Sequence, residues 1–231
     1  MIKKIVERCL DYCLKYKSFQ DYINSRFDLN EFVTIDGNYY SINRSILSVD
    51  DAKKCYKFDD IKSTDVILDI GANIGGFAIP ASRSASRVYA VEPLFCVQLQ
   101  NNIRKNNIDN IILFNYGLGK GKIKIKYNAK YNVVECLSLS EIINKCGGHI
   151  DFLKLDCEGE EWSIKPNELQ GIRRIEAEVH NFDGKRDFNN FLKILSIARF
   201  EYEYEIPNKI CMIVHASQQP KVDSISEQPK T

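Results

Sequence analysis

Two short stretches of this 231-residue chain carry the side chains that could do chemistry. The first is VILDIGANIGGF (66–77), which has the pattern of a buried strand followed by a glycine-rich turn and a helix. A turn that binds a pyrophosphate has the order G-x-G-x-x-G, and its second glycine lets the backbone approach the phosphates. Here Asn73 takes the place of that glycine, and Asp69 adds a negative charge beside the turn. The stretch therefore favours a cationic, nucleotide-like ligand over a pyrophosphate.

S-adenosylmethionine fits this charge pattern, because it carries an ammonium and a sulfonium group. Its carboxylate could use the free N–H groups at the start of the next helix. Glu92 follows Gly71 by 21 residues, at the end of the next expected strand, where an acid can accept ribose hydroxyls. The structural alternatives are a turn hydrogen bond for Asp69, a helix N-cap for Asn73 and a surface salt bridge for Glu92.

The second stretch is DFLKLDCEGEEW (151–162). Side chains alternate along a strand, so Lys154 and Asp156 share one face, and Glu158 follows as the strand ends. His180 ends the next expected strand, and ligands bind at this edge of open α/β sheets. A base here could take a proton from an acceptor. His180 has the ordinary pKa for that task, Asp156 or Glu158 could serve instead, and Lys154 could orient Asp156.

The same residues have structural interpretations. Lys154 could form a buried ion pair, for instance with Glu176 or Glu178, and His180 could be a structural hydrogen-bonding group. The two acids could be loop or cap residues. Two carboxylates and a histidine could also hold a divalent cation, although we predict no metal.

The elements that must position these residues alternate between strand and helix, which predicts a doubly wound, mostly parallel α/β sheet. Two later runs, RFEYEYEI and KICMIVHA, are linked only by Pro207 and Asn208, which forces an antiparallel hairpin. Asp36-Gly37 predicts another hairpin, and residues 120–128 a short exposed strand. Strands are expected at 66–70, 87–92, 111–116, 150–156 and 172–180, and helices at 74–84, 94–106 and 138–146.

Composition narrows the class of protein. The chain is 44% hydrophobic and 27% charged, with a net charge of +1, so binding of nucleic acid is disfavoured. Its eight cysteines form no C-x-x-C pair, which favours reduced thiols in a cytoplasmic protein. No run approaches the roughly 20 apolar residues of a membrane span. Residues 2–16 form a basic amphipathic helix pattern, which predicts packing on the domain or peripheral membrane contact through residues 1–19.

Five segments together resemble the FkbM-type S-adenosylmethionine-dependent methyltransferases: DIGANIGGF, VYAVEP, NNIRKNNIDNIILFNYGLG, DFLKLDCEGEEW and IEAEVH. The resemblance extends from about Asp65 to Asn181. It implies a Rossmann-like class I methyltransferase fold whose last strand is inserted antiparallel. It also implies O-methylation of a hydroxyl on a sugar, a glycan or a related small molecule. The prediction that the methyl group goes to an oxygen depends on the resemblance alone.

The sequence gives two sets of site residues, the first carried over by position from the resemblance and the second from the strand-end argument above. The expected cofactor site consists of Asp69, Gly71, Ala72, Asn73, Gly75, Glu92, Pro93, Asn115 and Gly117. The expected catalytic residues are Lys154, Asp156, Glu158 and His180.

The chain is thus expected to divide into an extension (1–60), the catalytic domain (61–216) and a disordered polar tail (217–231). Its expected partner is a small-molecule or glycan acceptor. Two other functions stay open: a catalytically silent binding protein with this fold, and an NAD-dependent oxidoreductase. The missing middle glycine counts against the oxidoreductase.

Overall fold

The computed structural model describes residues 32–41, 47–127 and 130–218. The helix expected at residues 2–16, with its alternative of membrane contact, lies outside the described residues. The expected polar tail (217–231) also lies outside them, except for its first two residues. Ser217 and Gln218 belong to strand β12.

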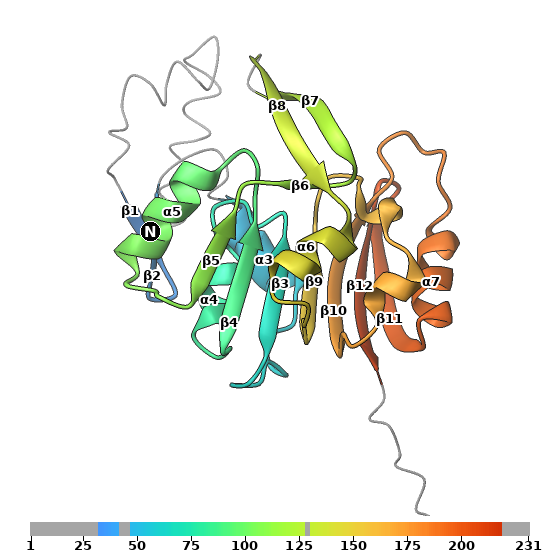
Figure 1. Ribbon diagram of the computed structural model, residues 1–231, viewed down its shortest axis with the longest axis horizontal. Helices are drawn as coiled ribbons and strands as arrows, with labels where there is room; N and C mark the ends of the chain where they lie inside the picture. Colours follow the sequence, from blue (N-terminus) through green and yellow to red (C-terminus); the bar gives the residue numbers. More distant parts are fainter. Residues whose placement is uncertain (1–31, 42–46, 128–129, 219–231) are drawn as a thin grey trace, which may run out of the picture.

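Seven strands form the central sheet, in the order β11-β12-β10-β9-β3-β4-β5 (Figure 1). Neighbouring strands run parallel except at β12, which is antiparallel to both β10 and β11. This confirms the predicted Rossmann-like fold with its terminal antiparallel hairpin. The strands are β3 (Val66–Ile70), β4 (Arg87–Val91), β5 (Ile111–Phe114), β9 (Phe152–Leu155), β10 (Arg174–His180), β11 (Phe200–Asn208) and β12 (Cys211–Gln218).

The turn of the terminal hairpin differs from the prediction. It lies at Lys209 and Ile210, whereas Pro207 and Asn208 belong to β11. Proline lacks the N–H that a strand ladder needs, so it is confined to edge strands and irregularities. Pro207 meets both conditions, because β11 is the edge strand and its register shifts between Glu205 and Asn208.

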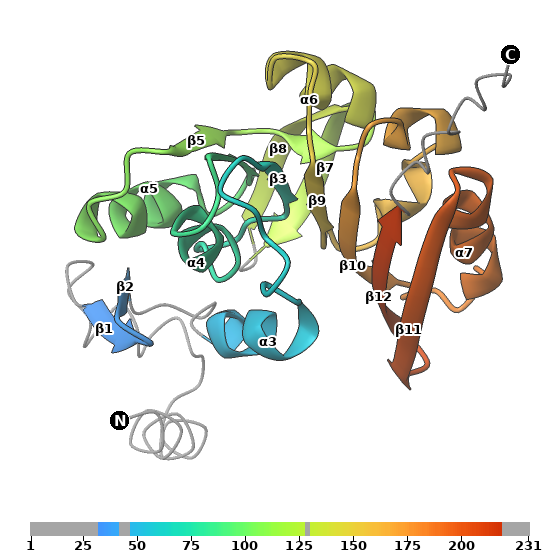
Figure 2. The same cartoon turned by 90° about the horizontal axis from the view of Figure 1, so that it is seen from below.

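Helices lie on both faces of the sheet (Figure 2). Because side chains alternate along β3, Ile67 packs with the layer of α3, α4 and α5, and Leu68 packs with the layer of α6 and α7. Asp69 and Lys154 therefore lie on the same face as Ile67, beneath the glycine turn. The helices are α3 (Leu47–Cys55), α4 (Ala78–Ser82), α5 (Cys96–Lys105), α6 (Leu139–Lys145) and α7 (Phe188–Ile197), with 3₁₀ helices at Glu161–Ser163 and Pro166–Leu169.

Helix α4 is shorter than the expected 74–84, because the glycine turn extends further. Asn73 and Gly75 have φ angles of 51° and 98°, in the left-handed region that an α-helix cannot use. The residue at the N-cap of α4 is Phe77. The predicted alternative for Asn73, an N-cap role, is therefore wrong, and the residue is free to serve the turn.

Two smaller sheets flank the central one. The predicted hairpin around Asp36-Gly37 is confirmed, with both residues at positive φ. The expected exposed strand at 120–128 is one strand of a second hairpin, which rises beside the carboxyl edge of the central sheet (Figure 1). The strands are β1 (Phe32–Ile35) and β2 (Asn38–Ser41) in one sheet, and β6 (Gly117–Leu118), β7 (Gly121–Tyr127) and β8 (Lys130–Leu137) in the other.

The thiol and membrane expectations can be compared with the described part of the chain. Its six cysteines are all free thiols; Cys136, Cys146 and Cys211 are buried and the other three are half-buried. Among the described helices, none has the length and apolar character needed to cross a membrane.

Gly71 marks the point where two strand ends touch. Its φ is +79°, and its N–H donates to the Val91 carbonyl at 2.9 Å. A Cβ atom at this position would lie 1.6 Å from the backbone oxygen of Asp156. The ends of β3 and β9 can therefore approach this closely only with glycine at position 71.

The structure predicts that Gly71→Ala destabilises the fold far more than Gly37→Ala. Both glycines have nearly the same φ (79° and 78°), but a Cβ at Gly37 would meet nothing within 4 Å. Gly37→Ala should lower the free energy of unfolding by about 1–2 kcal/mol, the cost of left-handed backbone alone. Gly71→Ala adds a backbone clash and should cost more than about 4 kcal/mol, or prevent folding. Urea unfolding of the two variants measures the difference, and equal costs would contradict the close contact.

Candidate active site

The glycine turn and the start of α5 hold the carboxylate of Glu92 between them. Its Oε2 accepts the Asn73 N–H at 2.9 Å, and its Oε1 accepts the N–H groups of Leu94 and Phe95 at 2.6 and 3.0 Å. Burial raises the pKa of Glu92, and the three N–H donors act against that rise. An ionised carboxylate has about four acceptor positions, so Glu92 has room for about one more donor.

A first cavity of about 280 Å³ opens between the glycine turn, the end of β4 and the β7–β8 hairpin. Five predicted cofactor residues line it: Gly71, Asn73, Glu92, Pro93 and Gly117. Its opposite wall is apolar and was not predicted as part of the site. That wall consists of Ile123, Ile125, Val134 and Cys136.

Four other predicted cofactor residues do not line this cavity. Asp69 is fully buried and ion-paired with Lys154, and Gly75 packs against Ile79 and Leu99. Ala72 faces a different cavity. Asn115 lies just beyond β5 and borders none of the cavities found in the described part of the chain.

A second cavity, of about 180 Å³, lies on the other side of the glycine turn, below α3. All four predicted catalytic residues line it, together with Glu178 and several residues of α3 and the turn. Four residues are common to both cavities: Gly71, Asn73, Asp156 and Glu158. The two cavities therefore adjoin at these four residues.

Two of the shared residues have unusual backbone conformations. Asn73 and Glu158 are not glycines, yet their φ angles are 51° and 59°. Such residues cluster at sites where the surrounding structure imposes a conformation for function. Asn73 Oδ1 is also buried without a hydrogen-bond partner among the described residues. The shared wall therefore has both strained backbone and an uncommitted polar atom.

Lys154 connects the turn to the acid side of the site. Its Nζ donates to the Gly71 carbonyl at 2.9 Å and lies 3.1 Å from Asp69 Oδ1 and 3.7 Å from Asp156 Oδ2. Burial alone would lower the pKa of Lys154, but the two carboxylates raise it. The ammonium group is therefore charged, and its partners are Asp69 and Asp156 rather than the suggested Glu176 or Glu178.

Asp156 has a partner that sequence reasoning missed. The buried Tyr56 hydroxyl donates to Asp156 Oδ2 at 3.0 Å and lies 3.5 Å from Glu178 Oε2. Tyr56 belongs to the segment after α3, whose local sequence gives no signal for this contact. Burial raises the pKa of Asp156, with Lys154 acting against it. Asp156 Oδ1 has no hydrogen-bond partner among the described residues. This oxygen can therefore accept a hydrogen bond or a proton from a ligand.

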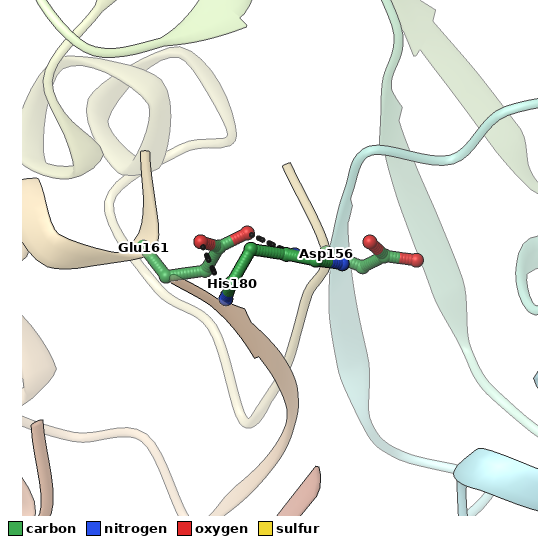
Figure 3. A group of neighbouring side chains, drawn as sticks. All are labelled: Asp156, Glu161 and His180. Atoms are coloured by element: carbon green, nitrogen blue, oxygen red, sulfur yellow. Dashed lines mark hydrogen bonds and ion pairs between the residues drawn. The ribbon is translucent and has the colours of Figure 1, made fainter. Parts of the chain in front are cut away.

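His180 lies between carboxylates (Figure 3). Its Nδ1 is 3.4 Å from Glu161 Oε1, and its Nε2 is 3.5 Å from Glu178 Oε1. Burial would lower the pKa of His180, but the two carboxylates raise it to about 10. The side chain is therefore an imidazolium at neutral pH, which does not suit the expected role of proton acceptor.

Asp156, Glu161 and His180 each offer a ligand atom within 4.8 Å of the others, close enough to share a metal ion. However, Glu161 is fully buried and accepts backbone N–H bonds from Cys157 at 2.7 Å and Gly159 at 3.0 Å. It also accepts the His180 N–H at 3.4 Å. With the His180 Nδ1 contact at 3.4 Å, these donors occupy the roughly four acceptor positions of the carboxylate, which a metal would need. Glu161 therefore holds the loop at residues 157–159 in place, a role that sequence reasoning missed.

The raised pKa of His180 predicts a pH-dependent contribution to stability. A histidine whose pKa is about 10 when folded and 6.5 when unfolded stabilises the fold fully below pH 6.5. That contribution is lost as the pH rises through 10. The difference in Tm between the wild type and His180→Gln should therefore be largest below pH 6.5 and shrink between pH 6.5 and 10. Lys122→Gln, at an exposed position on β7, provides the control for the loss of a surface cation. A His180→Gln difference that does not vary with pH would contradict the ion pairs.

Comparisons with known proteins agree on one class of enzyme. A family model described as "Methyltransferase domain" matches residues 95–215, just over half of the chain. A search of curated proteins found no match.

Several solved structures are similar in fold. M. jannaschii TYW2 in complex with AdoMet has 16% identity and a TM-score of 0.52, over 83% of this chain and 86% of TYW2. Precorrin-6y C5,15-methyltransferase from Geobacter metallireducens has 14% identity and a TM-score of 0.51, over 84% and 97% of the two chains. SMU.776 complexed with SAH has 10% identity and a TM-score of 0.55, over 83% and 57%. The chain covers 55% of the length of Pyrococcus abyssi Trm5b.

The family match covers the whole of the second stretch of site residues (151–162), and the structures above are similar in the fold that carries both stretches. The chain belongs to the methyltransferase domain family and is an S-adenosylmethionine-dependent methyltransferase.

Proposed function

We propose that this enzyme methylates a hydroxyl oxygen on a sugar, a glycan or a related small molecule, as the resemblance to FkbM-type enzymes implies. One observation supports the proposal above the others. The two cavities meet at Asp156, a carboxylate with a raised pKa and one uncommitted oxygen. An alcohol is a weak nucleophile, so a base at the junction is what O-methylation requires.

The first cavity fits S-adenosylmethionine. Glu92 would accept a ribose hydroxyl at its remaining position, and the apolar side chains of β7 and β8 would cover the adenine. Asn73 Oδ1, which is buried without a partner among the described residues, would meet the polar methionine end. When bound, the cofactor supplies an electrophilic methyl group on a positively charged sulfur. Asp69 does not line the cavity, so we assign it the indirect role of holding Lys154.

The second cavity would hold the acceptor. With an acceptor in this cavity, Asp156 Oδ1 would take the hydroxyl proton, and the acceptor oxygen would receive the methyl group as its bond to the cofactor sulfur breaks. Tyr56 and Lys154 fix the other oxygen of Asp156 and keep the carboxylate aimed. His180, as an imidazolium, balances the charge of Glu161 and Glu178 rather than accepting the proton.

The charges in the second cavity favour a small acceptor over a nucleic acid. Asp51, Asp156, Glu158 and Glu178 all line it, whereas Lys154 and His180 are both committed to internal ion pairs. A phosphate backbone would be repelled by this wall. Neutral hydroxyls, by contrast, can donate hydrogen bonds to carboxylates.

A methylation screen tests the proposal. The full chain is incubated with S-adenosylmethionine and separate panels of sugars, glycolipids, small alcohols and short RNAs, and methylated products are identified by mass spectrometry. A methylated product is not sufficient alone, so periodate resistance or fragmentation must place the methyl on oxygen. Methylation of RNA alone, or of nitrogen or carbon alone, would overturn the proposal. Tight cofactor binding without turnover on any panel would favour the silent binding protein.

Glu92→Gln should weaken cofactor binding roughly ten- to a hundredfold, because it removes a charge-assisted hydrogen bond of about 1.5–3 kcal/mol. Glu135→Gln is the matched control, since Glu135 is exposed on β8 and does not line the cavity. Isothermal titration with S-adenosylmethionine measures both dissociation constants. Unchanged affinity in Glu92→Gln would mean that the ribose does not lie at the end of β4.

Asp156→Asn should lower kcat by roughly 10²–10⁴-fold while the chain still binds the cofactor, because it removes the proton acceptor. Tyr56→Phe removes the hydroxyl that stabilises ionised Asp156, so the pKa of Asp156 should rise further. The acid limb of the pH profile of kcat should then move to higher pH. His180→Gln should move that limb in the same direction, because the imidazolium also lowers the pKa of Asp156. A limb that moves with His180 and not with Tyr56 would assign the base to His180.

A further inference from the structure

A third cavity, of about 230 Å³, continues from the second one beyond His180. It shares Glu158 and His180 with the second cavity, and its remaining walls are two loops, at residues 158–160 and 181–186. An acceptor that occupies the second cavity can therefore extend past His180 into the third without leaving the protein surface.

The outer loop of the third cavity is held in a defined conformation. The Asn181 side chain donates to the Arg186 carbonyl at 2.6 Å and accepts the Arg186 N–H at 3.2 Å. The Arg186 guanidinium donates to the Gly159 carbonyl at 2.8 Å and lies over the Trp162 ring at 5.4 Å. The two loops are thus tied to each other, and the cavity between them has fixed walls.

Phe182 places an aromatic face in this cavity. Its ring stacks on the His180 ring with centroids 4.9 Å apart and an angle of 20°. The Phe182 side chain is 55% exposed, whereas burial of a phenylalanine ring is favourable. One face is therefore supported by the imidazolium, and ligand can cover the exposed part of the ring.

Two carboxylates line the same cavity. Glu158 and Glu160 make no side-chain hydrogen bond within the described part of the chain, and the Glu160 carboxylate lies toward Gly119, where the third cavity adjoins the first. A flat apolar face next to free acceptors suits a molecule with an apolar face and many hydroxyl donors at its edge. A pyranose ring has this chemistry, because its C–H groups can lie on an aromatic ring while its hydroxyls bind carboxylates.

We propose that the third cavity is a second sugar subsite, which makes the acceptor a glycoside of at least two units. The unit to be methylated lies in the second cavity, at Asp156, and the next unit lies on Phe182. The subsite rests on the proposed function, since it adds a second unit to the sugar acceptor proposed above. It assigns Phe182 as a specificity-determining residue that takes no part in the chemistry.

The test compares the wild type, Phe182→Ala and Phe182→Tyr. A glycan array of mono-, di- and trisaccharides first identifies probes that bind the wild type in the presence of S-adenosyl-L-homocysteine. Trp162 is the single tryptophan of the chain and lies under Arg186 beside the cavity, so its fluorescence reports saccharide binding without turnover. Tyr204→Ala provides the matched control, because Tyr204 is an exposed aromatic residue on the distant edge strand β11.

Phe182→Ala should raise the dissociation constant of the di- or trisaccharide by roughly three- to tenfold, the value of one aromatic stacking contact. The constituent monosaccharide should bind both proteins equally, Phe182→Tyr should restore the wild-type affinity, and Tyr204→Ala should change neither. Steady-state kinetics should place the loss in KM rather than kcat. Equal effects of Phe182→Ala on mono- and disaccharides, or none on either, would overturn the subsite and leave sugar methylation standing. A chain that binds the cofactor but no saccharide would overturn the proposed function and the subsite together.

Discussion

The site depends on one buried cation. Lys154 holds the carbonyl of Gly71 and pairs with Asp69 and Asp156, so it joins the glycine turn to the acid that faces the acceptor side. A buried charge is tolerated only when it is paired and hydrogen-bonded, and Lys154 meets both conditions with groups from two segments, the end of β3 and the end of β9. Because these partners lie on adjacent strands, the position of Asp156 relative to the turn is set by the sheet itself.

This arrangement explains why the first and second cavities share a wall. The parallel strands β3, β4 and β9 end at one edge, where the backbone must turn away from the sheet. Asn73 and Glu158 turn it in the left-handed conformation, each at a point where two cavities meet. The strained residues lie where a methyl group would have to pass, and the supporting contacts of Glu92 and Glu161 keep the two turns in place.

The sequence predicted the parts of the site that follow from strand periodicity. Lys154 and Asp156 lie on one face because side chains alternate, and the strand order of the fold brings His180 beside them. The chemistry of His180 could not be predicted in the same way, because its pKa depends on Glu161 and Glu178, whose side chains converge only in three dimensions. Tyr56 was missed for the same reason: it lies 100 residues from its partner Asp156, in a segment without a pattern. Pro207 was predicted to lie in a turn, which placed the end of β11 too early. An edge strand tolerates a proline, so β11 continues through Pro207.

The contact between Gly71 and the Asp156 carbonyl also bears on how such an enzyme can change its substrate. Because the two backbones touch, an insertion in either turn would displace both the glycine turn and Asp156. The loop at residues 181–186 has no such contact with Gly71 and is anchored at its own ends. The loop at residues 181–186 can therefore change in sequence and length and so alter which acceptor binds. The two turns that meet at Gly71 and Asp156 cannot change in length without disrupting both cavities.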